Sequence, residues 1–372
     1  MRIELESSLA RWVQAELLDQ QQARRISEYE SSAAPPARSQ MPIFIGLALG
    51  GIALATGLLL FVSAHWDRMS PFERMATLVG GLAVLHAGGA LAAARFRAMS
   101  ITLHAIGTAL LGGAILLAGQ IFNMQEHWPA AILMWAAGAV AGAVLIRDWA
   151  QFALAAMLVP FWLVAEWTNA MQSSNGADQI ATTGVALLAI CYLSVRGRDS
   201  RAKALTWIGG LALLPAVLIL CLEGSGAFDG GRIRFTEPEA TYGWPGAMLL
   251  PLVFAFVYRR AGTWMNAVAA IWILGLAMIA DARFELGVYA LAALGAAGLV
   301  AWGIQESHAP RINLGMAGFF VNLIFFFFSS VMDKLGRSLS LIALGVVLLA
   351  GGWYGEKLRR RFVARARAGG VE

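Results

Sequence analysis

Twelve apolar segments follow one another along the chain, separated by short polar stretches. A helix needs about 20 apolar residues to cross the ~30 Å hydrocarbon core of a bilayer, and most of the segments approach that length. Lipid offers no partner to backbone hydrogen-bonding groups, so each segment is expected to be helical. The sequence therefore predicts an all-α protein, a polytopic transmembrane helical bundle of about 12 spans. The segments cover approximately residues 43–64, 75–94, 101–123, 129–146, 149–168, 179–196, 204–222, 244–258, 264–280, 286–304, 311–331 and 338–356.

The composition supports a membrane protein. Hydrophobic residues make up 59% of the 372 residues and charged residues only 14%, against roughly a quarter in soluble domains. A soluble chain of this length cannot bury so much apolar surface, which excludes an ordinary soluble domain. The formal net charge of +5 does not indicate nucleic acid as a partner, because the basic residues lie between the apolar segments and at the chain ends.

Two regions leave the span count open. The fourth and fifth segments are separated only by Arg147 and Asp148, so they could form one long bent helix. The eighth segment is short and contains Pro245 and Pro251, and the ninth is also short.

The distribution of Lys and Arg predicts the orientation. With a cytoplasmic N-terminus, three of every four of the 28 basic residues fall in cytoplasmic segments, as the positive-inside rule requires. Both termini are then cytoplasmic. The predicted domains are a cytoplasmic helical hairpin with a linker over residues 1–40, the transmembrane bundle over 41–356, and a basic cytoplasmic tail over 357–372.

The N-terminal segment has the pattern of two short amphipathic helices. Asp19 has the position of an N-cap, with Gln22 as its capping-box partner. Helices this short cannot build a core of their own, so their apolar face must be buried against the bundle, a second copy, a partner protein or lipid. Acidic residues outnumber basic ones here, which disfavours an anionic lipid surface. The candidate interaction face consists of Leu5, Leu9, Trp12, Val13, Ile26 and Tyr29.

Few polar residues within the apolar segments suggest a catalytic or transport site. Gln120 and Asn123 are three residues apart on one helix face and could line a polar cavity, or else hydrogen-bond between helices. The sequence lacks the common catalytic motifs, so an enzyme is not favoured and no cofactor is predicted. His86, His104, Asn266 and Asn322 also fall within spans. We expect them at different depths, satisfied structurally and not forming one site.

A metal or ligand site is conceivable at the outer rim. His65 and Asp67 follow the first segment, and Glu126 and His127 follow the third. Two imidazoles and two carboxylates could bind a transition metal if the two loops meet. The alternative is that these loops are ordinary membrane boundaries, because Trp66 and Trp128 beside them are typical interfacial anchors.

Several separated motifs point to a known family. They are LARWV from Leu9, LLDQQQA from Leu17, FVSAHWD from Phe61 and GAILLAGQIF from Gly113. Over roughly residues 5–150 the chain resembles a bacterial family of predicted membrane proteins, domain of unknown function two-one-five-seven. Two positions depart from its pattern: Glu16 stands where a Gly is expected in the hairpin turn, and His65 stands where Asn is usual. The resemblance implies the membrane class but no activity.

These observations favour a multi-pass protein of the bacterial inner (plasma) membrane that acts as a scaffold or interaction protein through its N-terminal hairpin. Its partners would be the lipid bilayer and either a second copy of the chain or another membrane protein. The alternative is a transporter or flippase of an apolar or amphipathic substrate, because Pro160, Pro215 and Pro251 can break helices around a cavity. No carboxylate lies near the middle of a segment, which disfavours proton-coupled transport.

Overall fold

The computed structural model describes residues 12–33, 41–65, 68–122, 127–172, 174–197, 199–224, 235–281 and 285–331, together with Leu9, Gly345, Val346 and Leu349. The chain divides into two compact units, residues 1–57 and residues 58–372. The predicted linker at 34–40 and the tail at 357–372 lie outside the described residues, as does most of the predicted last span.

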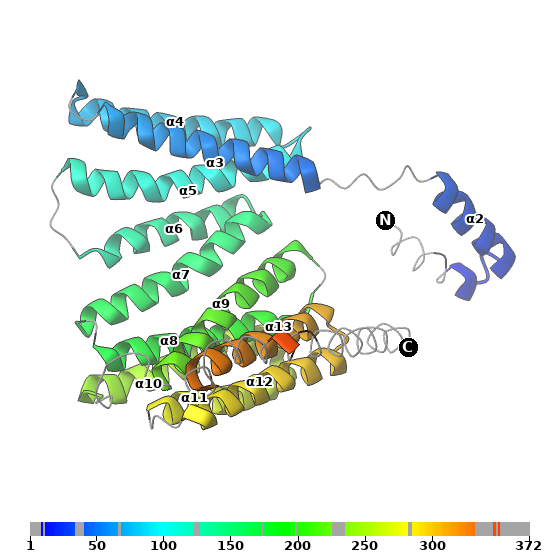
Figure 1. Ribbon diagram of the computed structural model, residues 1–372. Helices are drawn as coiled ribbons and strands as arrows, with labels where there is room; N and C mark the ends of the chain where they lie inside the picture. Colours follow the sequence, from blue (N-terminus) through cyan, green and yellow to red (C-terminus); the bar gives the residue numbers. More distant parts are fainter. Residues whose placement is uncertain are drawn as a thin grey trace. The chain divides into compact units, whose positions relative to one another are not determined.

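All regular secondary structure in the described part of the chain is helical (Figure 1). Eight of these helical segments are long and apolar enough to cross a membrane, and two shorter apolar helices, Leu49–Ala64 and Pro129–Leu145, accompany them. The predicted all-α membrane class is confirmed. The helices are α2 (Gln20–Ala33), α3 (Met41–Ala64), α4 (Pro71–Ala92), α5 (Arg97–Ile121), α6 (Pro129–Leu145), α7 (Trp149–Ala170), α8 (Asn175–Ser194), α9 (Ser200–Gly224), the π-helical turn η2 (Glu239–Gly243), α10 (Trp244–Arg259), the 3₁₀ turn η3 (Arg260–Thr263), α11 (Trp264–Asp281), α12 (Glu285–Gln305), α13 (Ala309–Phe326) and the π-helical turn η4 (Phe327–Val331).

In the N-terminal unit, the chain turns sharply between the helical residues 12–14 and α2. The amide of Glu16 donates to the carbonyl of Val13 at 3.1 Å, and the amide of Leu17 donates to the carbonyl of Trp12 at 2.9 Å. This pair of bonds is a Schellman motif, which places Glu16 in the left-handed region at φ 55°. The sharp turn thus forms with Glu16 at the position where a Gly was expected.

The predicted capping box at the start of α2 is present. The Asp19 carboxylate accepts from the Gln22 amide at 2.8 Å, and the Gln22 side chain accepts from the Asp19 amide at 3.1 Å. Two backbone donors at the start of the helix are therefore satisfied reciprocally.

The segment around Arg147 and Asp148 is a tight turn between two packed helices, α6 and α7, and not a bend in one long helix. Arg147 adopts φ 61°, and Asp148 caps α7 by accepting from the Gln151 amide at 2.7 Å. Gly142 permits the close approach of the two helices, since a Cβ there would lie 2.5 Å from Oε1 of Gln151. The same Oε1 accepts a hydrogen bond from Thr108 of α5 at 2.9 Å.

Helix α8 is the most buried of the candidate spans, and α10 packs along it in the same direction. A Cβ at Gly184, in the middle of α8, would lie 3.1 Å from the Cβ of Ala247, near the start of α10. Further along, the rings of Tyr192 and Phe254 meet edge to face with centroids 5.0 Å apart. The later contact lies further towards the C-terminus of both helices, so α8 and α10 are parallel.

Helix α11 packs along α8 in the opposite direction. Asn266, at the start of α11, donates to the Ser194 hydroxyl at 3.0 Å, and Gln179, at the start of α8, donates to the carbonyl of Ala277 at 3.1 Å. The apolar stretch 239–280 is therefore two antiparallel helices, and η3 with Arg260 at φ 48° reverses the chain between them. The uncertain eighth and ninth segments are separate helices.

Helices α12 and α13 form a second close hairpin. A Cβ at Gly315 would lie 2.7 Å from the carbonyl oxygen of Ala296, a distance that only Gly tolerates. Asn322 donates to the carbonyl of Tyr289 across the pair at 2.9 Å. Small residues and interhelical hydrogen bonds of this kind hold helices together where lipid removes the hydrophobic driving force between them.

Candidate functional site

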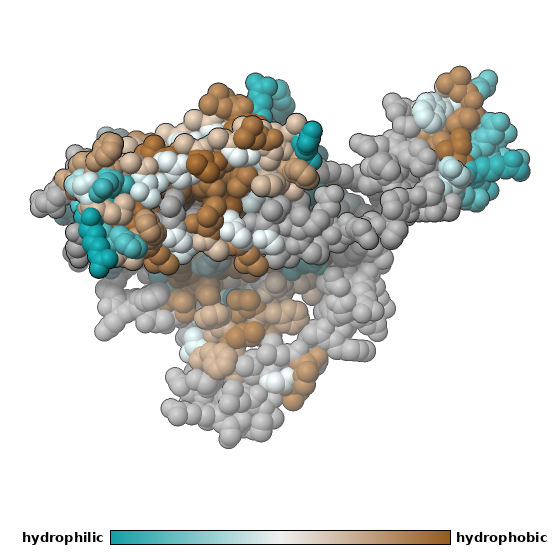
Figure 2. Space-filling view, turned by 90° about the horizontal axis from the view of Figure 1, so that it is seen from above, coloured by the Kyte–Doolittle hydropathy of each residue, from teal (hydrophilic) through white to brown (hydrophobic). Residues whose placement is uncertain are grey.

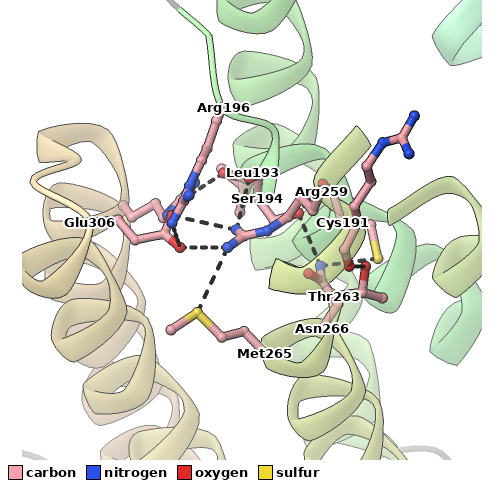
Figure 3. Close-up of polar contacts among 11 residues, drawn as sticks. Cys191, Leu193, Ser194, Arg196, Arg259, Thr263, Met265, Asn266 and Glu306 are labelled. Carbon is pink, nitrogen blue, oxygen red and sulfur yellow. Dashed lines mark hydrogen bonds and ion pairs between the residues drawn. The ribbon is translucent and has the colours of Figure 1, made fainter. Parts of the chain in front are cut away.

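Charged residues from three interhelical turns meet at one end of the bundle (Figure 3). Arg196 follows α8, Arg259 is the last residue of α10, Glu306 follows α12, and Arg311 lies in the first turn of α13. We call these four residues the arginine–glutamate cluster. Each element ends where its apolar run ends, so the helix hairpins bring these terminal charges together.

Glu306 is the centre of the cluster. Its Oε1 lies 2.9 Å from Nη2 of Arg196 and 2.5 Å from Nη2 of Arg259, and its Oε2 pairs with Nη1 of Arg311. The side chains of Arg259 and Arg311 are 1% exposed and that of Glu306 is 6% exposed, whereas Arg196 is 69% exposed. The first three therefore form a buried ion network, and Arg196 joins it from the surface.

The two buried arginines also cap the C-terminus of α8. Arg259 donates to the carbonyl of Ser194 at 2.9 Å, and Arg311 donates to the carbonyl of Leu193 at 2.7 Å. Cations are favourable at a helix C-terminus, where carbonyls lack partners and the helix dipole is negative. The indole ring of Trp302 lies beside both guanidinium groups, with its centroid 5.1 Å from Cζ of Arg259 and 4.9 Å from Cζ of Arg311.

Contacts within the cluster determine the protonation states of Glu306 and of the nearby His308. Burial opposes ionisation of Glu306, but hydrogen bonds from Arg259 and Arg311 outweigh it and hold the pKa of the carboxyl well below its usual range. Burial, together with the positive charge of Arg311, lowers the pKa of His308 to about 4. At neutral pH the turn therefore carries an ionised Glu306 and an uncharged His308.

The cluster has more positive charge and more donors than its own groups use. Three guanidinium groups share one carboxylate, and the partial negative charge of the α8 C-terminus offsets only part of the excess. Nη2 of Arg311 and Nε of Arg259 are buried and meet no acceptor among the described residues. Buried donors without partners are uncommon and costly, so an anion at this place would be stabilised.

An apolar cavity of about 630 Å³ adjoins the cluster. It lies among α8, α9, α11, α12 and α13, and its lining includes Trp302, Met265 and Gln305. Met265 Sδ is also 3.8 Å from Nη2 of Arg259, so this lining side chain separates the cavity from the nearest guanidinium. Its size is typical of small-molecule sites.

The residues of the predicted outer-rim site are only partly described. His127 lies 2.8 Å from the carboxylate of Glu166, and His65 lies 2.9 Å from the carbonyl of Phe61 through Nδ1. Asp67 and Glu126 lie outside the described residues. Among the residues that the structure describes, no group of three or more His, Cys, Asp or Glu side chains could hold a metal ion. The four-residue site therefore stays a prediction, and Glu166 is a partner of His127 that the sequence did not suggest.

The predicted polar cavity at Gln120 and Asn123 stays a prediction, because only one of the two residues is described. The side chain of Gln120 is exposed at the end of α5, and Asn123 lies outside the described residues.

His86 and His104, by contrast, lie at the same depth, and the expectation that they lie apart was wrong. Their Nδ1 atoms are 3.0 Å apart between α4 and α5. Each residue is only six or seven residues from the α4–α5 turn, which explains the equal depth. Each ring packs over a glycine of the opposite helix: a Cβ at Gly89 would lie 2.8 Å from His104, and one at Gly107 would lie 2.9 Å from His86.

The candidate interaction face of the hairpin is partly exposed. Trp12 is 43% exposed and Tyr29 is 70% exposed, while Val13 and Ile26 are half-buried and Leu9 is buried. Leu5 lies outside the described residues. Figure 2 shows apolar residues of the hairpin gathered together and bordered by hydrophilic ones.

Sequence reasoning did not identify the arginine–glutamate cluster. Its basic residues were counted as markers of topology, because each lies at the end of an apolar segment. The one signal was Glu306, a carboxylate in a short turn otherwise expected to be basic.

Comparison with known proteins finds a family model that matches part of the chain. Residues 10–152 match the family model described as "Predicted membrane protein (DUF2157)". The resemblance found in the sequence motifs is thereby confirmed. No curated protein and no solved structure matches the chain.

Proposed function

We propose that this chain, which matches the model of the DUF2157 family of predicted membrane proteins over residues 10–152, is an inner-membrane interaction protein that binds a protein partner through its N-terminal hairpin. The observation that carries this proposal is the exposure of the large apolar side chains Trp12, Leu17 and Tyr29 in the hairpin. Exposed apolar side chains that gather on a small polar unit are typical of interaction sites.

The charge of the hairpin favours a protein over lipid as the partner. Glu16, Asp19 and Glu28 are exposed beside the apolar side chains, as are Arg24 and Arg25. Amphipathic helices that lie on membranes carry mostly Lys and Arg on their polar face, and this hairpin does not. Partner binding would remove the indole of Trp12 and the ring of Tyr29 from water, which is the main energetic gain at protein interfaces.

Photocrosslinking in cells tests the proposal. A photoreactive amino acid at Trp12 or Ile26 of the full chain should give crosslinks to another protein or to a second copy of the chain. The matched control is Arg24, which is exposed on the opposite face of α2 and should crosslink far less. Deleting residues 1–38 should leave membrane insertion unchanged and abolish co-purification of the partner. Crosslinks only to lipid, or only within the same chain, would refute the proposal.

A second candidate is a transporter or flippase of an apolar or amphipathic substrate. The apolar cavity of about 630 Å³ beside the arginine–glutamate cluster is the observation that favours it. Movement of a fluorescent lipid between leaflets by the reconstituted protein, but not by protein-free vesicles, would favour this candidate over the first.

A further inference from the structure

The apolar cavity has the dimensions of a single lipid chain. Its lining along α12 runs from Ala292 to Gln305, a rise of roughly 20 Å at 1.5 Å per residue. One leaflet of a bilayer contributes about half of the ~30 Å hydrocarbon core. Gln305 and Asn322 are polar exceptions in a lining of aliphatic and aromatic side chains, so the interior of the cavity suits hydrocarbon and not water.

The arginine–glutamate cluster lies directly behind one end of this cavity. Trp302 and Met265 line the cavity and also contact the guanidinium of Arg259. Arg259 and Arg311 are both buried but share only one carboxylate, Glu306. An uncompensated charge in a low-dielectric environment is costly, and a second anion would reduce this cost.

We infer that the cavity binds an anionic phospholipid, with an acyl chain along α12 and the phosphodiester at the arginine–glutamate cluster. Nη2 of Arg311 and Nε of Arg259, which lack acceptors among the described residues, and the exposed head of Arg196 supply the donors. Guanidinium groups are well suited to phosphate oxygens. Basic pockets between transmembrane helices on the cytoplasmic side are a known form of anionic-lipid site, and the charge distribution predicts that this end is cytoplasmic.

The chemistry selects this occupant over simpler ones. A neutral lipid would fill the cavity but leave the positive charge uncompensated. A soluble anion would compensate the charge but leave about 630 Å³ of apolar space unfilled. An anionic phospholipid does both, and the bilayer supplies it at high local concentration.

Native mass spectrometry of the detergent-purified full chain tests the inference. The protein is incubated with equal amounts of dioleoyl phosphatidylglycerol and dioleoyl phosphatidylcholine, and the bound lipids are counted. We expect one phosphatidylglycerol to remain bound in preference to phosphatidylcholine. Equal retention of the two lipids would overturn the inference.

Two pairs of variants locate the site. Gly298 lines the cavity and Gly246 does not, and a Cβ at either position would meet no atom within 4 Å. Gly298→Phe should therefore remove the bound lipid, and Gly246→Phe should not. Arg196→Gln should lower the preference for phosphatidylglycerol about fivefold, the effect of one basic residue near an anionic headgroup. Lys203→Gln, which removes an exposed charge near the start of α9, should leave the preference unchanged.

Three results would contradict this assignment. Retention of phosphatidylglycerol by Gly298→Phe would place the lipid elsewhere. Equal effects of Arg196→Gln and Lys203→Gln would indicate general surface charge and not a site. Absence of bound lipid, combined with a lower melting temperature for Gly298→Phe than for Gly246→Phe, would show that another part of the chain fills the cavity.

Discussion

At the scale of single residues, Glu306 and His308 make the turn between α12 and α13 sensitive to acid. Both groups have folded-state pKa values below their ordinary values, so the unfolded chain binds their protons more readily than the folded protein does. Stability therefore decreases as the pH falls. For Glu306 the loss begins only below its ordinary range, near pH 4, while for His308 it begins at about pH 6.5.

The His308→Gln variant separates the two contributions. Between pH 6.5 and about 4, the unfolded chain protonates His308 but the folded protein does not, because burial and Arg311 lower the pKa of this imidazole to about 4. The melting temperature of the wild-type protein in detergent should fall by a few degrees across this window. His308→Gln cannot titrate and should show a shallower slope between pH 6.5 and 4.5. Identical slopes would mean that other groups dominate the acid response.

At the scale of helices, the turn at Glu16 carries backbone strain that the sequence pattern of the family would avoid. A non-glycine residue in the left-handed region costs about 1 kcal/mol or more relative to Gly, and Glu16 adopts φ 55°. Glu16→Gly should therefore stabilise the hairpin by about 1 kcal/mol, which corresponds to about fivefold slower hydrogen exchange at the amides of residues 12–33.

The matched control is Glu28→Gly in the same full-length protein. Residue 28 lies inside α2, where Gly weakens a helix by about 1 kcal/mol relative to a good helix former. This substitution should accelerate exchange in α2. If Glu16→Gly also accelerated exchange, the left-handed turn would not be the conformation of the hairpin in solution.

Helix existence was predictable from the sequence because apolar runs and capping residues act locally. The first eleven apolar segments correspond to the helices α3 to α13, and Asp19 and Gln22 cap α2 as predicted. Contacts between helices were not predictable in this way. Glu306 and Arg259 are 47 residues apart, and only the directions of α8, α10 and α12 bring them together. The contact between His86 and His104 has a more local cause, because both residues lie six or seven residues from the α4–α5 turn.

At the scale of the whole molecule, the basic turns lie together. The arginine–glutamate cluster joins the ends of α8, α10 and α12, and Arg201, at the start of α9, donates to the carbonyl of Arg147 in the α6–α7 turn at 2.9 Å. Turns that alternate along the chain thus share one end of the bundle, which is what the alternating distribution of Lys and Arg requires. The structure and the charge pattern agree on which turns are on the same side.

Reporter fusions test on which side of the membrane these turns lie. Fusions after residues 40, 126, 175, 200, 232 and 372 should read cytoplasmic, external, external, cytoplasmic, external and cytoplasmic, because the positive-inside rule places the basic turns in the cytoplasm. The readings at 126 and 175 flank α6 and α7, and should agree because these helices form a hairpin. An external reading at 372 with a cytoplasmic reading at 40 would make the number of spans odd. Since α6 to α13 have defined directions, the error in the span count would then lie in the predicted span at 338–356 or before α6.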